Sequence, residues 1–216
     1  MTPMIRLARE GTVFTGSPDD LAALTSTYRT HHWLRLPQLV APNLLQLVKD
    51  SLRDEPFVPR EHAGIGKELS TGAGGALAVL TFLLNDQRLF DLIGDITGCD
   101  DIQCFTGRIY RMDPDSEHYD SWHDDLTGHR RVAMSLNLAE EEHQGGVLQI
   151  RDRVSKEILQ EVHNTTYGDA VIFKLAPELQ HRVTAVVGGA PRMAFAGWFR
   201  SQPSIRELLS PTVVAL

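Results

Sequence analysis

The spacing of apolar residues changes near residue 100 of the chain. Upstream of that point, Pro42 opens a helical pattern whose apolar face consists of Leu44, Leu45, Val48 and Leu52. Two apolar stretches of helical length follow at residues 76–84 and 89–96. We therefore expect residues 1–100 to be mainly helical.

Shorter signals complete the first hundred residues. The motif Ser-Pro-Asp-Asp at residues 17–20 predicts a helix start, because a hydroxyl cap, a proline in the first turn and early acidic groups all suit a helix N-terminus. That helix is expected to run to about Thr30, and residues 33–36 alternate as a short strand. Glycine and polar residues dominate residues 64–75, which predicts a flexible loop there.

Beyond Cys99 the pattern becomes one of short β-branched and apolar runs separated by turn residues. These runs lie at residues 108–112, 132–138, 147–150, 158–162, 170–173, 183–187 and 193–199. Short strands at such regular spacing favour an antiparallel sandwich or barrel over β-α-β units. We expect a single domain over residues 1–216, in which a mainly helical support carries a β core at residues 101–200.

The composition is that of a folded protein with a core of its own. Hydrophobic residues make up 42% and charged residues 23% of the 216 positions, which excludes disordered and fibrous chains. The formal charge of -7 has the wrong sign for a protein that neutralises phosphate backbones, so no nucleic-acid partner is expected. Two cysteines are too few for a disulfide framework, and no apolar stretch is long enough to span a bilayer. These features predict a cytoplasmic protein without membrane contact.

The first candidate for chemistry is the sequence Trp-His-Asp-Asp at residues 122–125. Where this sequence enters a strand end, side-chain alternation places His123 and Asp125 on one side and Asp124 on the other. An imidazole and a carboxylate on one side can share a metal ion. Without further support, a hydrogen-bonded surface pair is the simpler interpretation.

Residues farther along the chain supply that support. His181 begins a later run that can return beside the first in an antiparallel barrel, and two histidines with one carboxylate form the open site of non-haem Fe(II) oxygenases. The H-E-x-x-H signature of zinc hydrolases is missing. Arg192 opens the last long strand, and its small neighbours Ala194 and Ala196 leave space for a bound carboxylate, although a salt bridge would also explain a single arginine.

The ordered set His123, Asp125, His181 and Arg192 resembles the Fe(II)- and 2-oxoglutarate-dependent dioxygenases, in particular their prolyl-4-hydroxylase-like branch. The resemblance covers roughly residues 102–200. Further matching features are tyrosines at positions 110 and 119, the motif Gly-Gly-Val-Leu at 145–148, the run at 168–173, and Trp198-Phe199 in the closing strand.

This resemblance implies a double-stranded β-helix, or jelly-roll, core braced by helices, with Fe(II) held by His123, Asp125 and His181. It implies that 2-oxoglutarate chelates the iron and places its far carboxylate on Arg192, in a pocket to which we assign Tyr110, Ser135, Leu148 and Trp198. O2 is the second cosubstrate and ascorbate a further candidate cofactor. The implied reaction is hydroxylation of an unactivated C–H bond with release of succinate and CO2. Asp125 favours this reaction over halogenation, because halogenating relatives carry a small residue at that position.

The substrate class stays open among an amino acid, a small metabolite and a peptide side chain. The acidic stretch at residues 113–124 is compatible with a cationic substrate, although acidic loops are more often merely solvated. His62, together with Arg60 and Lys67, lies where related enzymes often carry substrate-covering segments, and we expect a lid there.

Two other functions fit the sequence less well. Nucleic-acid demethylases of the superfamily carry a second arginine six residues after the first, and here that position is Trp198. A cupin-like metal-binding sensor would keep the metal ligands but would need no carboxylate receptor such as Arg192.

Overall fold

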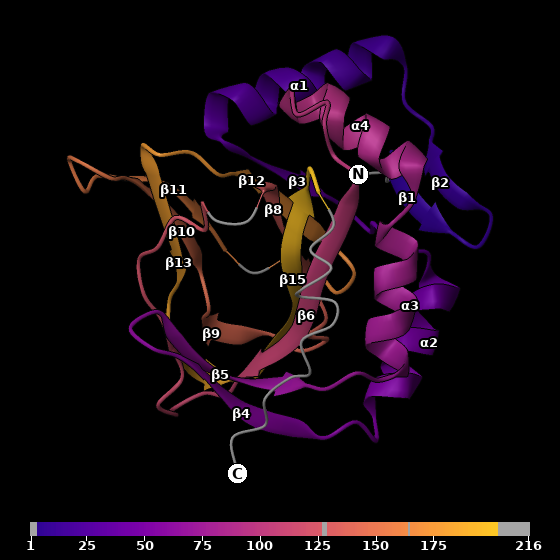
Figure 1. The fold of residues 1–216 in the computed structure, drawn as a ribbon. Helices are drawn as coiled ribbons and strands as arrows, with labels where there is room; N and C mark the ends of the chain where they lie inside the picture. The colour runs from indigo at the N-terminus through magenta and orange to yellow at the C-terminus, as the bar shows by residue number, and fades with distance from the viewer. Residues whose placement is uncertain (1–3, 127–128, 164, 203–216) are drawn as a thin grey trace.

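The computed structural model describes residues 4–126, 129–163 and 165–202 (Figure 1). Its largest element is an eight-stranded antiparallel sheet, which we call the main sheet. In spatial order its strands are β3 (Trp33–Leu36), β12 (Ala170–Lys174), β8 (Arg130–Asn137), β15 (Arg192–Arg200), β6 (Cys104–Met112), β5 (Gly66–Thr71) and β4 (Phe57–His62), with β7 (Tyr119–Asp120) paired to β5.

A second, smaller sheet faces the main sheet on the left of Figure 1. Its strands, again in spatial order, are β11 (Ile158–Val162), β10 (Leu148–Asp152) and β13 (Leu179–Val183). Two further sheets have two strands each. One is the hairpin of β1 (Ile5–Ala8) and β2 (Gly11–Phe14), and the other pairs β9 (His143–Gly145) with β14 (Val186–Gly189). The curled antiparallel strands of the C-terminal part are consistent with the expected jelly-roll core.

Four helices lie on the other side of the main sheet (Figure 1): α1 (Pro18–His31), α2 (Pro42–Leu52), α3 (Gly75–Leu84) and α4 (Gln87–Thr97). All four occupy predicted positions. The α1 start is a capping box, because Ser17 Oγ accepts from the Asp20 N–H at 3.2 Å while Asp20 Oδ2 accepts from the Ser17 N–H at 2.8 Å. None of the helices in the described ranges is long and apolar enough to cross a membrane.

The prediction of a mainly helical N-terminal half is not confirmed, since strands β1 to β5 share that half with the helices. Half of the loop expected at residues 64–75 is in fact strand β5, which pairs with β4 and with β6. The sequence conceals this hairpin because β4 is an edge strand with half-exposed and exposed residues, so no apolar alternation marks it.

The strand expected at residues 183–187 is also wrong in its bounds, because β13 ends at Val183 and β14 begins at Val186. Between them Thr184 bonds to Val147, and the Gly146 N–H donates to the Ala185 carbonyl. The chain therefore changes partners within this run, from β10 to β9. A continuous apolar run gives no sign of such an exchange.

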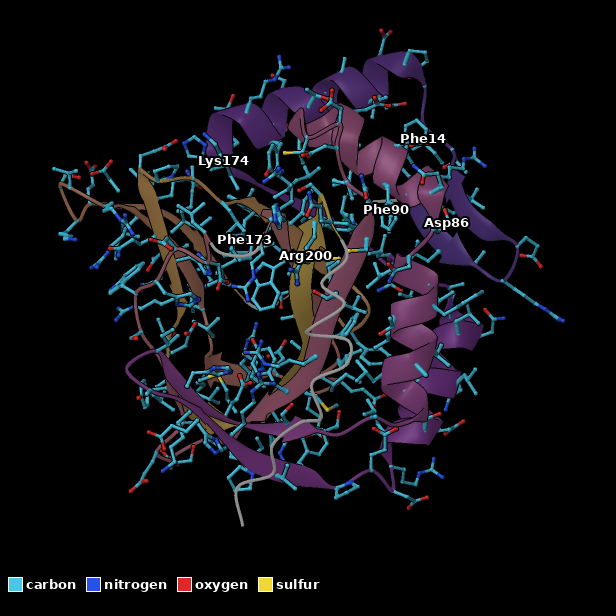
Figure 2. The ribbon with its side chains drawn as sticks, viewed as in Figure 1. Phe14, Asp86, Phe90, Phe173, Lys174 and Arg200 are labelled. Atoms are coloured by element: carbon cyan, nitrogen blue, oxygen red, sulfur yellow. The ribbon has the colours of Figure 1, made fainter. Side chains whose placement is uncertain are left out.

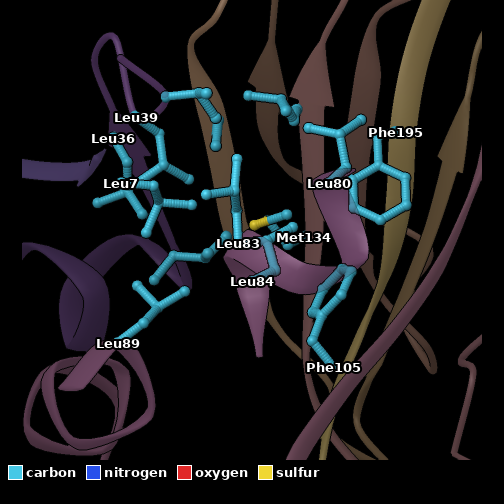
Figure 3. Close-up of a cluster of buried hydrophobic side chains, with 14 of the residues drawn as sticks. Leu7, Leu36, Leu39, Leu80, Leu83, Leu84, Leu89, Phe105, Met134 and Phe195 are labelled. Atoms are coloured by element: carbon cyan, nitrogen blue, oxygen red, sulfur yellow. The ribbon is translucent and has the colours of Figure 1, made fainter. Parts of the chain in front are cut away.

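Strands of the main sheet present alternate residues to two separate cores, as the two-residue period of a strand requires. On the helix side, leucines of the N-terminal part pack against Phe105, Met134 and Phe195 (Figure 3). On the other side, small and aromatic residues face the smaller sheet. Figure 2 shows the two environments, with Phe90 of α4 on the helix side and Phe173 of β12 between the sheets. Burying one Leu or Phe side chain completely stabilises the fold by about 1.5–3 kcal/mol. The leucines of the helices therefore contribute much of the stability of the core on the helix side of the main sheet.

This alternation decides where the candidate site residues point. Along β15, Phe195 and Phe199 belong to the helix-side core, whereas Ala194 and Trp198 face the smaller sheet. Arg192 has the same parity as Ala194. The space between the sheets is therefore the place where Arg192 and the residues that accompany it meet.

Gly197 of β15 lies directly opposite Gly107 of β6, and the close approach of the two strands there can be tested. A Cβ at this position would overlap with the backbone of Thr106 and Gly107. We expect Gly197→Ala to destabilise the protein by about 2–3 kcal/mol, which in a domain of this size lowers the melting temperature by about 4–12 °C. Thermal unfolding followed by circular dichroism checks this. Gly72→Ala is the matched control, since a Cβ at Gly72 meets nothing within 4 Å; equal melting temperatures for the two variants would refute the close approach of the strands.

Candidate functional site

The structure brings His123, Asp125 and His181 together at the space between the sheets. Each residue offers one ligand atom, and the three atoms lie within 4.8 Å of one another. Asp125 Oδ2 is 3.6 Å from His123 Nε2 and 3.4 Å from His181 Nε2. Two imidazoles and one carboxylate on one side of a metal leave the remaining positions open, which is the donor set of non-haem Fe(II) sites. The residues present therefore fit the predicted ion.

Backbone pairing, and not strand alternation alone, produces this convergence. The N–H of His123 donates to the carbonyl of His181 at 3.1 Å, and the N–H of His181 donates back at 2.9 Å. Residues paired in this way place their side chains on the same face, and the two imidazole rings lie 4.3 Å apart. Asp125 has a left-handed backbone, with φ at 56°, that turns its carboxylate back toward the imidazoles. Asp124 is not part of this group and pairs with Arg153.

Neighbouring groups orient the three candidate ligands. His123 Nδ1 lies 2.7 Å from the Ser121 carbonyl, which favours a proton on Nδ1 and leaves Nε2 for a metal. Asp125 Oδ2 accepts from Trp198 Nε1 at 2.8 Å, and Asp125 Oδ1 accepts from Arg130 Nη1 at 2.6 Å. The Arg130 guanidinium stacks on the Trp198 ring at 3.5 Å. Trp198 thus contacts a candidate metal ligand, and Arg130 is a site residue that the sequence analysis missed because no motif includes it.

The charges of the site are strongly coupled in the metal-free protein. Burial by itself lowers the pKa of His123, but its hydrogen bond to Asp125 and the charges of Asp120 and Asp125 outweigh burial and raise this pKa to about 9. Burial lowers the pKa of His181 and keeps that imidazole neutral. Burial opposes the ionisation of Asp125, yet its bonds to the two histidines hold its pKa well below the usual range. At neutral pH the site therefore contains a carboxylate, one imidazolium and one neutral imidazole.

This charge state predicts a pH-dependent metal affinity. A metal that takes His123 Nε2 has to displace its proton, so the apparent affinity is expected to rise by up to about tenfold per pH unit between about pH 6 and pH 8, and to level off near the His123 pKa. Calorimetric titration of the metal-free protein with Mn²⁺ in buffers of different ionisation enthalpy measures the effect. We expect about one proton released per ion at neutral pH. An affinity independent of pH, with no proton release, would show that His123 does not bind the metal.

Arg192 occupies a position next to this group in the same cavity. Its guanidinium donates to the Tyr110 hydroxyl and, at 3.3 Å, to Ser135 Oγ. It forms no ion pair with any carboxylate in the part of the chain that the structure describes. The salt-bridge explanation for Arg192 therefore finds no support, and a partly buried cation faces the cavity without a counter-charge from any described residue.

The four other residues assigned to the cosubstrate pocket all line the cavity that contains Arg192. Tyr110 and Leu148 are buried and line the cavity with Ser135. Trp198 lines it too, but its polar edge is used by Asp125. Tyr119, the other tyrosine ahead of His123, is 41% exposed on β7. Of the two tyrosines, Tyr110 is therefore the one in contact with the arginine.

The acidic stretch ahead of the metal ligands is largely neutralised within the protein. Asp113 pairs with Arg111 at 2.8 Å, and Glu117 pairs with Lys67 at 2.5 Å. Asp120 Oδ2 accepts from the Val183 N–H at 2.8 Å, and burial raises the pKa of this carboxyl group. These three acidic side chains therefore have partners within the protein and do not add unpaired negative charge to the cavity.

Comparison with known protein families gives a match for the C-terminal part of the chain. Residues 107–200 match the sequence profile of the 2OG-Fe(II) oxygenase superfamily. This segment contains every candidate metal and cosubstrate residue named above. Comparison with curated proteins gave no match.

Solved structures resemble the chain over most of its length. A prolyl-4-hydroxylase from Pseudomonas putida has a TM-score of 0.64 at 21% identity, covering 85% of this chain and 100% of its own. An oxidoreductase of the 2OG-Fe(II) oxygenase family from Burkholderia pseudomallei has a TM-score of 0.65 at 18% identity, with coverages of 88% and 93%. A non-haem α-ketoglutarate-dependent epimerase of nogalamycin biosynthesis has a TM-score of 0.62 at 13% identity, and each chain is covered to 93%. At these identities the similarity establishes the fold.

Proposed function

We propose that the chain, whose residues 107–200 match the 2OG-Fe(II) oxygenase superfamily, acts as a 2-oxoglutarate-dependent Fe(II) oxygenase that hydroxylates a C–H bond of an amino acid, a small metabolite or a peptide side chain. One molecule each of O2 and 2-oxoglutarate would be consumed, one oxygen atom entering the substrate and the other entering succinate, with loss of CO2. The observation that carries the proposal is the presence, in one cavity, of the His123, Asp125 and His181 group and of the Arg192 guanidinium, which has no counter-charge within residues 4–126, 129–163 and 165–202.

In this proposal His123, His181 and Asp125 would hold the iron, the histidines through Nε2 and Asp125 through its carboxylate. When bound, it supplies the activation of O2 and the oxidising power released as 2-oxoglutarate is decarboxylated. The chain's own groups have defined tasks. His123 gives up its Nε2 proton when the metal binds, and Trp198 and Arg130 hold the Asp125 carboxylate in place.

The cosubstrate side of the cavity is arranged for a dicarboxylate. The Arg192 guanidinium can bind the far carboxylate of 2-oxoglutarate through two parallel N–H bonds, with hydroxyl groups of Tyr110 and Ser135 beside it. Burial raises the pKa of Tyr110, so its hydroxyl stays protonated and can donate to a carboxylate. Leu148 forms an apolar wall that excludes water from this end of the cavity.

Succinate formation and product mass test the proposed reaction. The protein reconstituted with Fe(II) is supplied with 2-oxoglutarate and O2 and with panels of amino acids, small metabolites and peptides. We expect succinate release to be stimulated by the true substrate in equal proportion to a product heavier by one oxygen atom. Stimulated succinate release with a product of unchanged mass would contradict hydroxylation and favour a rearrangement such as an epimerisation. A cationic substrate, a role for ascorbate and a cytoplasmic location stay predictions; the paired acidic stretch gives the first of them no support.

A further inference from the structure

The cavity has a second polar wall, formed by β4, β5 and β6, and the Tyr110 ring lies between its Arg108 and Arg192, at 5.6 Å and 5.2 Å from the two guanidinium carbons. Arg108 of β6 and Glu68 of β5 both line the cavity and form a two-point ion pair, with Nε to Oε1 at 2.6 Å and Nη2 to Oε2 at 3.3 Å. Arg60 of β4 stands directly across from Glu68 in the ladder, which puts the two side chains on the same face of the hairpin. His62, two residues beyond Arg60, shares that face and also lines the cavity.

Two guanidinium groups accompany one carboxylate in this cluster: Arg108 lines the cavity with Glu68, and Arg60 stands beside Glu68 behind the lining residues. Glu68 is the one carboxylate of the set, and both of its oxygens are already bonded to Arg108. Arg60 is partly buried, yet none of the described carboxylates comes within 4.0 Å of its guanidinium. His62 Nε2 is buried and has no hydrogen-bond partner among the described residues. Unsatisfied buried polar atoms of this kind are uncommon and point to a group that completes them.

The electrostatics of the wall agree with this geometry. Burial, followed by the charge of Arg108, lowers the pKa of Arg60. Burial, followed by the charges of Arg60 and Arg108, lowers the pKa of His62. The charge of Asp125 acts on His62 in the opposite direction, which places His62 within electrostatic range of the candidate metal ligands. An anion bound here would relieve the repulsion among the three cationic or proton-donating groups.

We propose that Arg60, His62 and Arg108 receive a carboxylate of the substrate that is oxidised. This inference rests on the proposed function and narrows it, because the substrate becomes an anionic organic acid or amino acid bound by its carboxylate. Guanidinium groups suit this task, since each can offer two parallel N–H donors to a carboxylate. The cavity then has two separate anion receptors, with Arg192 serving the cosubstrate and the hairpin wall serving the substrate. The hairpin expected as a flexible lid is in this view a substrate-binding strand pair.

Three probes with similar carbon tails and different charges test the proposal. They are isovalerate, isovaleramide and isopentylamine, titrated into protein loaded with Zn²⁺ and a stoichiometric amount of 2-oxoglutarate, so that no turnover occurs. The readout is the NMR signal of the His62 ring in histidine-labelled protein, assigned with the His62→Gln variant. We expect isovalerate to shift this signal in a saturable way, and the amide and the amine to leave it unchanged.

Three variants predict in which direction the affinity for isovalerate changes. Arg60→Gln should weaken isovalerate binding by about tenfold, as expected for the loss of a hydrogen bond to a charged group. Glu68→Gln should tighten isovalerate binding, because it removes the carboxylate that competes for Arg108. Arg53→Gln is the control, since Arg53 is exposed and paired with Asp50 on α2 and the turn after it.

The outcomes separate this inference from the function on which it rests. If Zn²⁺ and 2-oxoglutarate fail to shift the signals of His123 and His181, the proposed function fails. If they bind but isovalerate leaves His62 unchanged, or isopentylamine binds better than isovalerate, the anionic-substrate inference alone is overturned. Binding of isovalerate that is equal in the Arg60→Gln, Glu68→Gln and Arg53→Gln variants overturns it as well.

Discussion

Replacing Arg192 with alanine is expected to weaken the binding of 2-oxoglutarate by about 30- to 1000-fold, since losing one partner of a desolvated charge pair costs about 2–4 kcal/mol. The structure gives the reason: among the described carboxylates none pairs with Arg192, so the far carboxylate of 2-oxoglutarate would be its counter-ion. Metal affinity should change by less than about twofold, because Arg192 does not contact the candidate metal ligands. Calorimetric titrations of the variant with Mn²⁺, and then with 2-oxoglutarate, measure both quantities.

Two further variants make this result specific. Arg192→Lys keeps the charge but loses the two-point geometry, and it should bind 2-oxoglutarate with intermediate affinity. Arg131→Ala removes an exposed arginine that pairs with Asp101 at the surface and should have no effect. Wild-type affinity for 2-oxoglutarate in Arg192→Ala would mean that the cosubstrate carboxylate binds elsewhere.

Replacing Asp125 with alanine should reduce metal affinity by at least about 100-fold, more than the 10- to 100-fold typical of losing an outer-shell partner. The substitution removes the one carboxylate among the three candidate ligands and, with it, an acceptor for Trp198 Nε1 and Arg130 Nη1. Oxygenase activity should fall to background. Metal content after gel filtration, measured by mass spectrometry, checks the first effect, and succinate release checks the second.

Because Asp125 also holds two neighbouring donors, the alanine variant needs a control for folding. Asp125→Asn keeps an oxygen acceptor in a side chain of the same shape and removes the charge. We expect it to melt near the wild-type temperature and still to lose most of its metal affinity. An asparagine or alanine variant that retains iron and full activity would refute the assignment of Asp125 as a ligand.

Much of the fold was predictable because its strongest signals are local. Helix α1 begins at a capping box visible at residues 17–20, and α2 has an apolar face that the sequence shows directly. The strands of the C-terminal part are short apolar runs between turns. The β4–β5 hairpin was missed because an edge strand that is half exposed needs no apolar alternation, and its partner β6 lies some 40 residues farther along the chain. That pairing is decided by tertiary contacts. The single-domain organisation stays a prediction.

The site was predictable to the extent that chemistry is tied to motif. The three candidate ligands and Arg192 follow from the resemblance to a family that has these residue types in this order, and the structure places all four in one cavity. The path by which Asp125 reaches the histidines was not predictable, since it depends on a left-handed backbone at a non-glycine residue. Arg130 was missed for a related reason. Its contact with Asp125 is set by the position of β8 beside β15, and nothing in the spacing of the two residues marks it.

The most direct test is an anaerobic titration of the metal-free protein with Fe(II) and then with 2-oxoglutarate, followed by visible absorption. Chelation of iron by the cosubstrate produces a metal-to-ligand charge-transfer band, so the measurement requires no knowledge of the substrate. We expect the band to appear in the wild-type protein, to be lost in His181→Ala, and to require much higher 2-oxoglutarate concentrations in Arg192→Ala. A protein that binds Fe(II) but shows no band at any 2-oxoglutarate concentration would contradict the oxygenase assignment of this site and favour a metal-binding sensor.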